Sequence, residues 1–471
     1  MRISGLNSGI DTEQMIKDLM TAQRIPVDRV YQQKVKVEWK RDAYREINTK
    51  LLRLRNFTFD MTLQGTFDRN VATSSHTDIL TVNATGKAQA GTYDLKVEKL
   101  AKAAQVVATG VTLPSTGSFT IGLAVGGEVS EEIEIDFAEG KSLQDIAAEI
   151  NKSKDLGILA FASGDSISFT SKATGEDVEI VLGGDYAIFG DDVQARTAGQ
   201  NAEVRVNGVT LSNSSNSFDL NGITVNLLSA SPGTDVRVEV RHDVDAVVDK
   251  IKEFVNLYNE IVDELNLSTR EEVFRDFLPL TPEQREALSD KEIEQWEEKA
   301  KSGLLRSDPM LSRVLSEMRM ALAGAVGIEG DHKSLAQIGI TTGSWYEYGR
   351  LNINEEKLRV AVEANPTGVR DIFTFDSAEE GKQGIARRLD SVLKGAMERI
   401  EKTAGKASTP YDTSALGEQI RDFESRLSVM EERLLRFEEA QWRKFTALEK
   451  VLGQLYAQSD WLVQQITAMQ G

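Results

Sequence analysis

This chain of 471 residues, with 40% hydrophobic and 27% charged residues, has the composition of a soluble globular protein of about three domains. Its formal charge of −19 argues against general nucleic-acid binding, and no apolar run is long enough to cross a membrane. The absence of cysteine excludes disulfides, thiolate metal sites and a cysteine nucleophile.

The N-terminal residues are predicted to form one long helical region. Residues 1–10 lack the apolar core of a signal peptide, so we expect a cytosolic chain or one exported without a cleaved signal. A helix is predicted to begin at Asp11 or Thr12, to bend or restart at Pro26, and to end near Met61. Its apolar residues repeat every seven positions, which is typical of a coiled coil: Val30, Val37, Tyr44 and Leu51, with Ile47 and Leu54 between them.

From about residue 71 to residue 241 the apolar period changes from 3.5 to 2, which predicts half-buried antiparallel strands. A short helix is expected from Ser142 to Ile150, with Ser142 as its cap. The stretch from about Gly110 to Thr197 reads as a second unit nested inside the first. Turns are predicted at four dipeptides: Gly126-Gly127, Gly183-Gly184, Asn207-Gly208 and Asn221-Gly222.

Helical periodicity returns after His242, with turns and short strands expected at Ser334–Ile340 and Gly349–Ile353 and short helices at Asn354–Ala364 and Gly368–Phe375. Residues 268–302 are charged and contain prolines, which predicts a surface excursion with short helices. Asp308-Pro309 has the pattern of a helix start, and residues 405–413 predict a break before a helix from about Leu416 to Met469. That helix repeats the seven-residue step at Ile420, Leu427, Leu434, Leu448, Leu455 and Leu462, and at Phe423, Met430, Phe437 and Val451. Gln441, Lys444 and Gln458 interrupt the repeat.

The predicted fold is therefore a multidomain α+β protein. Antiparallel β head domains are inserted between long N- and C-terminal helices, which form a helical or coiled-coil stalk. The predicted segments are a terminal leg that is disordered until assembly (1–41), an N-terminal stalk helix (42–70), a discontinuous β head domain (71–109 and 197–241), a nested variable β head domain (110–196), a helical stalk domain (242–440) and a C-terminal leg (441–471).

The apolar stripes of the terminal helices allow two interpretations. They form a bundle within one monomer, or part of the seam has no partner until chains associate. Each buried leucine contributes about 1.5–3 kcal/mol relative to an exposed one, so we favour association, with the ends disordered in the monomer. The expected oligomer or filament contacts are Met15, Ile16, Leu19, Val30, Val37, Leu434, Phe437, Leu448, Leu452, Leu455, Leu462 and Ile466.

The charge is unevenly distributed along the chain. Residues 24–55 contain ten Lys or Arg and four Asp or Glu, whereas residues 128–149 contain eight acids and one Lys. Both segments read as solvated faces, or the basic helix meets an acidic partner surface.

No catalytic constellation stands out. The three histidines, His76, His242 and His332, lie far apart in polar surroundings without metal-ligand spacing. The glycine-rich turns lack the features of a phosphate-binding loop. We therefore expect no enzyme activity, no metal and no cofactor.

Several motifs, in the same order along the chain, resemble the bacterial flagellar filament cap family, also called the hook-associated protein 2 family. They cover both ends and most of the chain after about Ala198, and the resemblance is thin from about Gly110 to Thr197. The stretch Ala202–Leu228 is similar to a repeat motif of hook-associated proteins. The other matching stretches are Ile3–Asp11, Met15–Met20 with Pro26, Phe254–Val262, Leu335–Ile340 and Gly349–Asn354 with Lys357 and Leu358.

The resemblance implies a non-enzymatic structural cap at the distal tip of the flagellar filament. It implies a ring-like homo-oligomer of about four to six subunits, under whose plate exported flagellin folds and inserts. Implied partners are flagellin, hook-filament junction proteins and a cytoplasmic export chaperone, with no nucleic acid and no membrane insertion. It also implies secretion by flagellar type III export and an extracellular location.

Two alternatives remain open at this point. The variable head from Gly110 to Thr197 could be a tip adhesin that binds surface or host glycans, which is compatible with a cap. The β head could instead house a carbohydrate-active enzyme with paired carboxylates.

Overall fold

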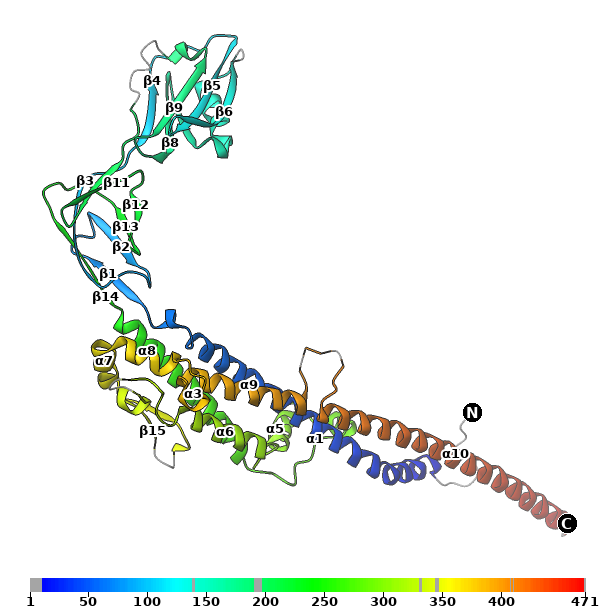
Figure 1. Ribbon diagram of the computed structural model, residues 1–471. Coiled ribbons are helices and arrows are strands. Elements are labelled where there is room, and N and C mark those ends of the chain that lie inside the picture. The colour runs from blue at the N-terminus through cyan, green and yellow to red at the C-terminus, as the bar shows by residue number, and fades with distance from the viewer. Residues whose placement is uncertain are drawn as a thin grey trace. The chain divides into compact units, whose positions relative to one another are not determined.

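The computed structural model describes residues 11–137, 140–189, 197–329, 333–343, 347–406, 408–409 and 411–469. The chain divides into two compact units. We call Met1–Gln64 with Val248–Gly471 the helical unit, and Gly65–Val247 the β unit (Figure 1).

The long helices of the chain are α1 (Thr12–Asp60), α3 (Val244–Arg270), α6 (Pro309–Leu322), α9 (Ile385–Ala404) and α10 (Ala415–Met469). Shorter helices are α4 (Pro282–Glu286), α5 (Asp290–Lys301), α7 (Glu355–Ala364) and α8 (Pro366–Thr374). A small antiparallel pair joins β15 (Ile340–Thr342) to β16 (Leu351–Ile353).

Helix α1 begins as predicted, because the Asp11 side chain accepts a hydrogen bond from the Gln14 N–H at 2.9 Å. The helix passes through Pro26 without restarting. Pro26 and Ala22 are both exposed, so the carbonyl that the proline leaves without a donor can bind water. Residues 12–41 and 441–469, which were predicted to be disordered until assembly, are helical in this structure.

The predicted stripe of α1 is buried in its C-terminal half, where the helix packs against α9 and α10 (Figure 1). Tyr44, Ile47, Leu51 and Leu54 are at most 4% exposed. Packing between the two ends of the chain is thus confirmed. Helix α9, which was not predicted from the sequence, supplies much of this core through Leu389, Leu393 and Ile400, among others.

The discontinuous domain of the β unit is a sandwich of two antiparallel sheets. One has the order β1-β14-β3-β10-β11 and the other the order β12-β13-β2. Their strands are β1 (Asn70–Ser74), β2 (Leu80–Ala84), β3 (Gly91–Lys99), β10 (Ala202–Val206), β11 (Val209–Asn213), β12 (Ser217–Leu220), β13 (Ile223–Leu227) and β14 (Val236–His242).

Both Asn-Gly hairpins of this domain are confirmed. Asn207 and Gly208 have φ angles of 48° and 87° and connect β10 to β11. Asn221 and Gly222, at 54° and 87°, connect β12 to β13. Positive φ at both central positions gives the turn the twist that a two-residue hairpin needs.

The nested β domain packs two further sheets around four phenylalanine rings. Their orders are β4-β8-β7 and β6-β5-β9. The Phe119 ring lies 5.8 Å from that of Phe137 and 4.9 Å from that of Phe189, and Phe169 lies 5.6 Å from Phe189. The elements are β4 (Ala103–Ala108), β5 (Gly117–Val125), β6 (Glu128–Phe137), α2 (Leu143–Lys152), β7 (Ile158–Ser163), β8 (Ser166–Thr174) and β9 (Val178–Gly184). Helix α2 is capped by Ser142, as predicted.

The domain boundary differs from the predicted one. Strand β4, which was assigned to the first domain (71–109), pairs with β8, and its residues Ala104, Val106 and Ala108 belong to the nested core. Ala101 is the last buried residue before it in the other core. The change of domain therefore lies between Ala101 and Ala104, because strand pairing decides which core receives β4.

The predicted turn at Gly183-Gly184 is wrong. These residues end β9 and pair with Thr120 and Phe119 of β5. A Cβ atom on Gly183 would lie 2.6 Å from the Thr120 hydroxyl oxygen, so close strand approach explains this glycine. The Gly126-Gly127 turn is confirmed between β5 and β6.

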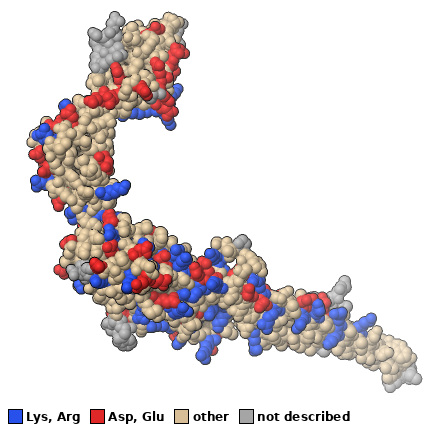
Figure 2. All heavy atoms as spheres, in the orientation of Figure 1, with Lys and Arg blue, Asp and Glu red and all other residues tan. Residues whose placement is uncertain are grey.

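Strands β6 and β7 each lie at one margin of a sheet of the nested domain, and their side chains and contacts differ. Strand β6 carries exposed Glu132, Glu134 and Asp136, and Figure 2 shows acidic side chains gathered over this part of the domain. Along β7, the Asn151 side chain of α2 bonds the Ala160 backbone twice. Its amide nitrogen donates to the carbonyl oxygen at 2.7 Å, and its oxygen accepts from the N–H at 2.9 Å.

Candidate assembly site on the terminal helices

Helices α1 and α10 run antiparallel along part of their length. Lys34 of α1 lies 3.4 Å from Glu424 of α10, whereas Arg45, further along α1, lies 2.7 Å from Asp412, just before α10. Arg45 also donates from Nε to the Ala404 carbonyl at the end of α9, at 2.8 Å. One arginine of α1 therefore holds both sides of the break between α9 and α10.

A buried polar link joins α1 to α6. The carboxylate of Asp308, 6% exposed, accepts hydrogen bonds from the backbone N–H groups of Met310 and Leu311, which caps α6 as predicted. Its other oxygen accepts the Tyr44 hydroxyl at 2.5 Å, and the Lys40 ammonium lies 3.8 Å from it. Burial and the hydrogen bond to Asp308 together raise the pKa of Tyr44, so the phenol stays neutral and donates.

The basic face of α1 meets acidic side chains of the same chain. Lys50 lies 2.8 Å from Glu264 of α3, and Arg55 lies 3.1 Å from Asp390 of α9. Lys34 pairs with Glu424 as described above. The acidic partner surface considered from the sequence is thus supplied, at these positions, within the chain.

The charged segment 268–303 wraps onto α1 instead of standing free. The Gln32 amide donates to the Pro279 carbonyl at 2.9 Å, and Arg24 forms an ion pair with Glu283. Lys301 lies over the ring of Trp39, 5.0 Å from its centroid. The segment has its own small apolar centre, in which the Phe277 ring lies 4.6 Å from that of Trp296.

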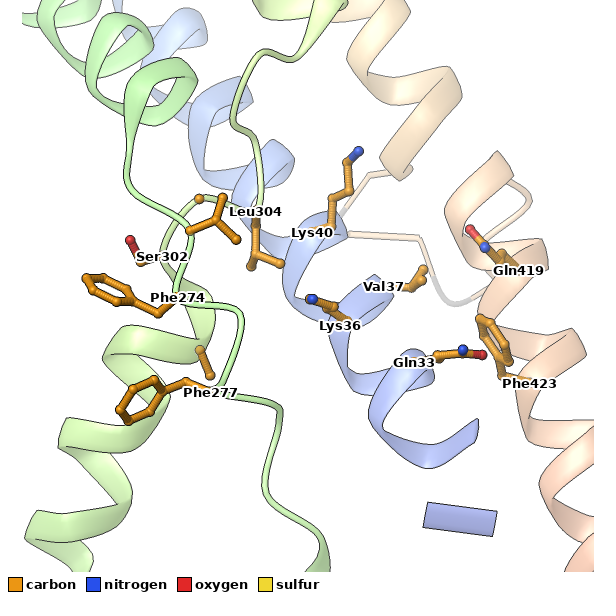
Figure 3. Close-up of a pocket in the computed structure, with 13 residues that line it drawn as sticks. Gln33, Lys36, Val37, Lys40, Phe274, Phe277, Ser302, Leu304, Gln419 and Phe423 are labelled. Atoms are coloured by element: carbon orange, nitrogen blue, oxygen red, sulfur yellow. The ribbon is translucent and has the colours of Figure 1, made fainter. Parts of the chain in front are cut away.

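Beside this segment lies a cavity of about 510 Å³, lined by α1, residues 273–304 and α10 (Figure 3). We call it the leg groove. Val37 and Lys36 come from α1, Phe274 and Phe277 from the charged segment, and Phe423 from α10 (Figure 3). Aromatic and aliphatic walls with a few polar groups are typical of binding grooves. This groove was not predicted from the sequence.

The predicted contact residues fall into three groups. Ile16 is buried, at 3% exposure. Partly buried positions are Val30, Val37, Leu434, Phe437 and Leu452. Exposed positions, at 40–55%, are Met15, Leu19, Leu448, Leu455, Leu462 and Ile466. Six further large apolar side chains of α10 are exposed and were not in the predicted set: Val429, Leu435, Val451, Tyr456, Trp461 and Val463.

Most of the exposed large apolar side chains of α10 lie between Leu448 and Ile466. The residues of α10 that lie in ion pairs with α1 or in the shared groove, such as Glu424 and Phe423, belong to its N-terminal part. Figure 2 shows few charged side chains towards the C-terminal end of the helix. Contiguous apolar surface of this kind marks an interaction site.

Few of the described residues are arranged in a way that suits catalysis or metal binding. They contain no group of three or more His, Asp or Glu side chains that could hold a metal. Burial lowers the pKa of His242, Ser75 bonds to His76 at 2.9 Å, and His332 lies outside the described residues. Among the described helices, none is long and apolar enough to span a membrane.

Residues 199–457 match the family model of the flagellar hook-associated protein 2 C-terminus, and residues 8–104 match that of its N-terminus. The chain belongs to the flagellar hook-associated protein 2 family. A flagellar hook-associated protein 2 from Halalkalibacterium halodurans is 33% identical over 97% of this chain and 98% of its own length. The hook-associated protein 2 of Escherichia coli is 26% identical over 98% of this chain and 97% of its own length.

Fold comparison agrees with this family. The crystal structure of the D1-D2-D3 domains of the Escherichia coli flagellar cap protein covers 81% of this chain and 99% of that chain, with a TM-score of 0.57 and 23% identity. The predicted α+β architecture of long terminal helices and antiparallel β domains is confirmed. The flagellin hook IN motif matches residues 118–173, inside the stretch from Gly110 to Thr197 where the motif resemblance is thin. The repeat motif predicted at Ala202–Leu228 lies instead within the C-terminal family match.

Proposed function

We propose that this protein is a non-enzymatic cap at the distal end of the bacterial flagellar filament. The family match over both ends and the β unit supports the proposal. The single observation that carries it is the apolar end of α10, because a structural protein that seats itself on other subunits needs such a surface.

In this proposal a ring of about four to six copies forms a plate, and exported flagellin folds and inserts beneath it. The protein reaches the filament tip by flagellar type III export, with a cytoplasmic chaperone before secretion, and it also meets the hook-filament junction proteins. It acts by confining the incoming subunit and shielding its apolar surface, so no catalytic group is required.

The terminal helices are proposed to order fully only on assembly. Each large apolar side chain that moves from water into an interface contributes about 1.5–3 kcal/mol. Four of these side chains are about half-exposed in the single chain and could be buried on assembly: Leu448, Leu455, Leu462 and Ile466. The entropy lost when a segment folds on binding offsets part of this stabilisation.

The test is flagellin release by cells that lack this chain. We expect heavy spillage of monomeric flagellin and absent filaments, both restored by the full chain but not by a chain without residues 1–41 and 441–471. The full chain carrying Lys394→Glu, an exposed change on α9, is the matched control and should restore filaments. Normal filaments without the chain would contradict the cap function.

A second test concerns the interruptions of the apolar repeat. If a leg must bind and release, then Gln441→Leu, Lys444→Leu and Gln458→Leu together should tighten assembly and slow filament growth. Gln464→Leu adds apolar surface on another side of α10 and is the control. Unchanged filament growth in the triple variant would count against a tuned leg.

The nested β domain is not proposed as an adhesin, because no observation in its described residues singles out a glycan site. A chain without the nested domain that still assembles filaments would show that this domain is dispensable for capping.

A further inference from the structure

The two ends of the charged segment 268–303 are fastened to each other. The Gly303 N–H donates to the Glu271 carboxylate at 2.8 Å, and the Ser302 hydroxyl donates to the Glu272 carbonyl at 2.6 Å. The segment therefore leaves the helical unit and rejoins it at one place. A short linker between the fastened ends can take its place without a change in the positions of α3 and α6.

Between these ends the segment has contacts of its own. The Trp296 indole N–H donates to the Leu278 carbonyl at 2.8 Å, and the Trp296 ring packs on the Phe277 ring. Arg285 of α4 lies 2.7 Å from Glu297 of α5, and α4 begins with a capping box. A segment that is fixed internally in this way can hold a neighbouring helix in place.

The charged segment contacts one face of α1 at three levels. Arg24, Gln32 and Trp39 of α1 make the ion pair, the hydrogen bond and the cation–π contact described above. At about 100° and 1.5 Å per residue, these positions lie within roughly 80° of one another around the helix and cover roughly 22 Å of its length. The segment thus runs along about four turns of α1.

Helix α10 holds the other side of α1. Lys34, which lies 3.4 Å from Glu424 of α10, is about 160° around α1 from Gln32 and about 140° from Trp39. Over this stretch α1 therefore lies between α10 and the charged segment, and each of them contacts a different face.

Buried groups contribute more to this docking than charges do. The Arg24–Glu283 ion pair is exposed, and exposed ion pairs contribute little to stability. By contrast, Val27 of α1 and Leu280, which follows Pro279 in the sequence, are 7% and 5% exposed. Substitutions of buried positions are therefore the ones that test the contact.

We infer that the charged segment is an intramolecular brace that keeps residues 24–40 of α1 helical before copies of the chain assemble. A helix without packing partners is at best marginally stable in water. Residues up to 41 were predicted to be disordered until assembly, yet α1 is helical from Thr12. The brace accounts for the difference, because it adds a second packing partner from within the chain.

The brace divides the terminal legs into two kinds of segment. Residues 24–40 are ordered in the single chain and lose less conformational entropy when copies associate. Residues 441–469 lie beyond the brace and order fully on assembly, as proposed above. The inference goes beyond the cap function and does not depend on it, because every contact that carries it lies within one chain.

Hydrogen exchange followed by mass spectrometry tests the brace, with the monomeric fraction of the full chain from size-exclusion chromatography. Replacing residues 273–301 by Gly-Ser-Gly removes the brace. Peptides from residues 24–40 should then exchange about tenfold faster or more. Peptides from residues 44–54, which pack against α9, are the internal reference and should keep their protection. Equal protection of residues 24–40 with and without the segment would overturn the inference, since α10 alone would then suffice.

A pair of point variants tests the same contact with the segment present. Leu280→Asp places a charge at a buried position, whereas Leu278→Asp, two residues away, changes a side chain that is 45% exposed. Leu280→Asp should speed exchange in residues 24–40, and Leu278→Asp should leave it unchanged. Fast exchange in both variants, or in neither, would contradict a brace that acts through its buried side chains.

Discussion

The buried carboxylate of Asp308 should be one of the most sensitive single positions of the helical unit. Replacing it with alanine removes the cap of α6, which costs about 1 kcal/mol. It also leaves the buried Tyr44 hydroxyl without its acceptor, which costs about 1–3 kcal/mol. We therefore expect Asp308→Ala to lower the free energy of unfolding of this unit by about 2–4 kcal/mol.

Tryptophan fluorescence in urea gives a selective assay, because all five tryptophans lie in the helical unit and none in the β unit. Asp308→Asn keeps a side-chain oxygen for capping and should cost less than Asp308→Ala. Tyr44→Phe removes only the hydroxyl. In a double-mutant cycle, Tyr44→Phe with Asp308→Ala should cost less than the sum of the two single changes.

Strict additivity in that cycle would refute the reasoning, because it would mean that the hydroxyl and the carboxylate do not interact. An Asp308→Ala variant as stable as the native chain would also refute it. If Asp308→Ala fails to fold, Tyr44→Phe still tests the interaction, because its smaller cost leaves the unfolding of the helical unit measurable.

Three further results are expected. Burial opposes ionisation of Asp412, but hydrogen bonds from Ser414 and the charge of Arg45 outweigh it and lower its pKa. The ionised Asp412 carboxylate therefore stabilises the helical unit at neutral pH, and this stabilisation is lost as the pH falls below about 4. Asp412→Asn should flatten the acid titration of tryptophan fluorescence. Gly183→Ala should speed hydrogen exchange in β5 and β9 because its Cβ would meet Thr120, whereas Gly65→Ala, which has open space around its Cβ, should not. Pro26→Ala should raise the helix content and thermal stability of α1, since an interior proline costs up to about 3 kcal/mol relative to alanine; an unchanged melting temperature would indicate that the proline costs α1 nothing.

Local signals predicted local structure well. Asp11, Ser142 and Asp308 cap helices where the sequence predicted them, because a side-chain oxygen next to free backbone N–H groups acts within one turn. The Asn-Gly hairpins were predictable for the same reason. Helix α9 was missed although its apolar spacing is regular. Its N-cap is Gly384, which has no side chain that could cap the helix and so indicate its start in the sequence.

Features that depend on distant parts of the chain could not be predicted. The residues of β4 contain no pattern that assigns the strand to the nested domain. Its pairing with β8 assigns it there. The leg groove draws on α1, residues 273–304 and α10, three segments far apart in sequence. The apolar repeats showed that the terminal helices belong together, but not which residues stay exposed once they pack.

The double hydrogen bond from Asn151 to Ala160 covers part of the β7 margin of the nested domain. A bare strand margin is a template on which the strand of another molecule can grow. The Asn151 amide presents the same donor and acceptor as a neighbouring strand and occupies the middle of β7. Only short stretches on either side stay open, and neither offers a row of consecutive bonds. This margin of the nested domain is thus a poor template for the strand of a neighbouring molecule.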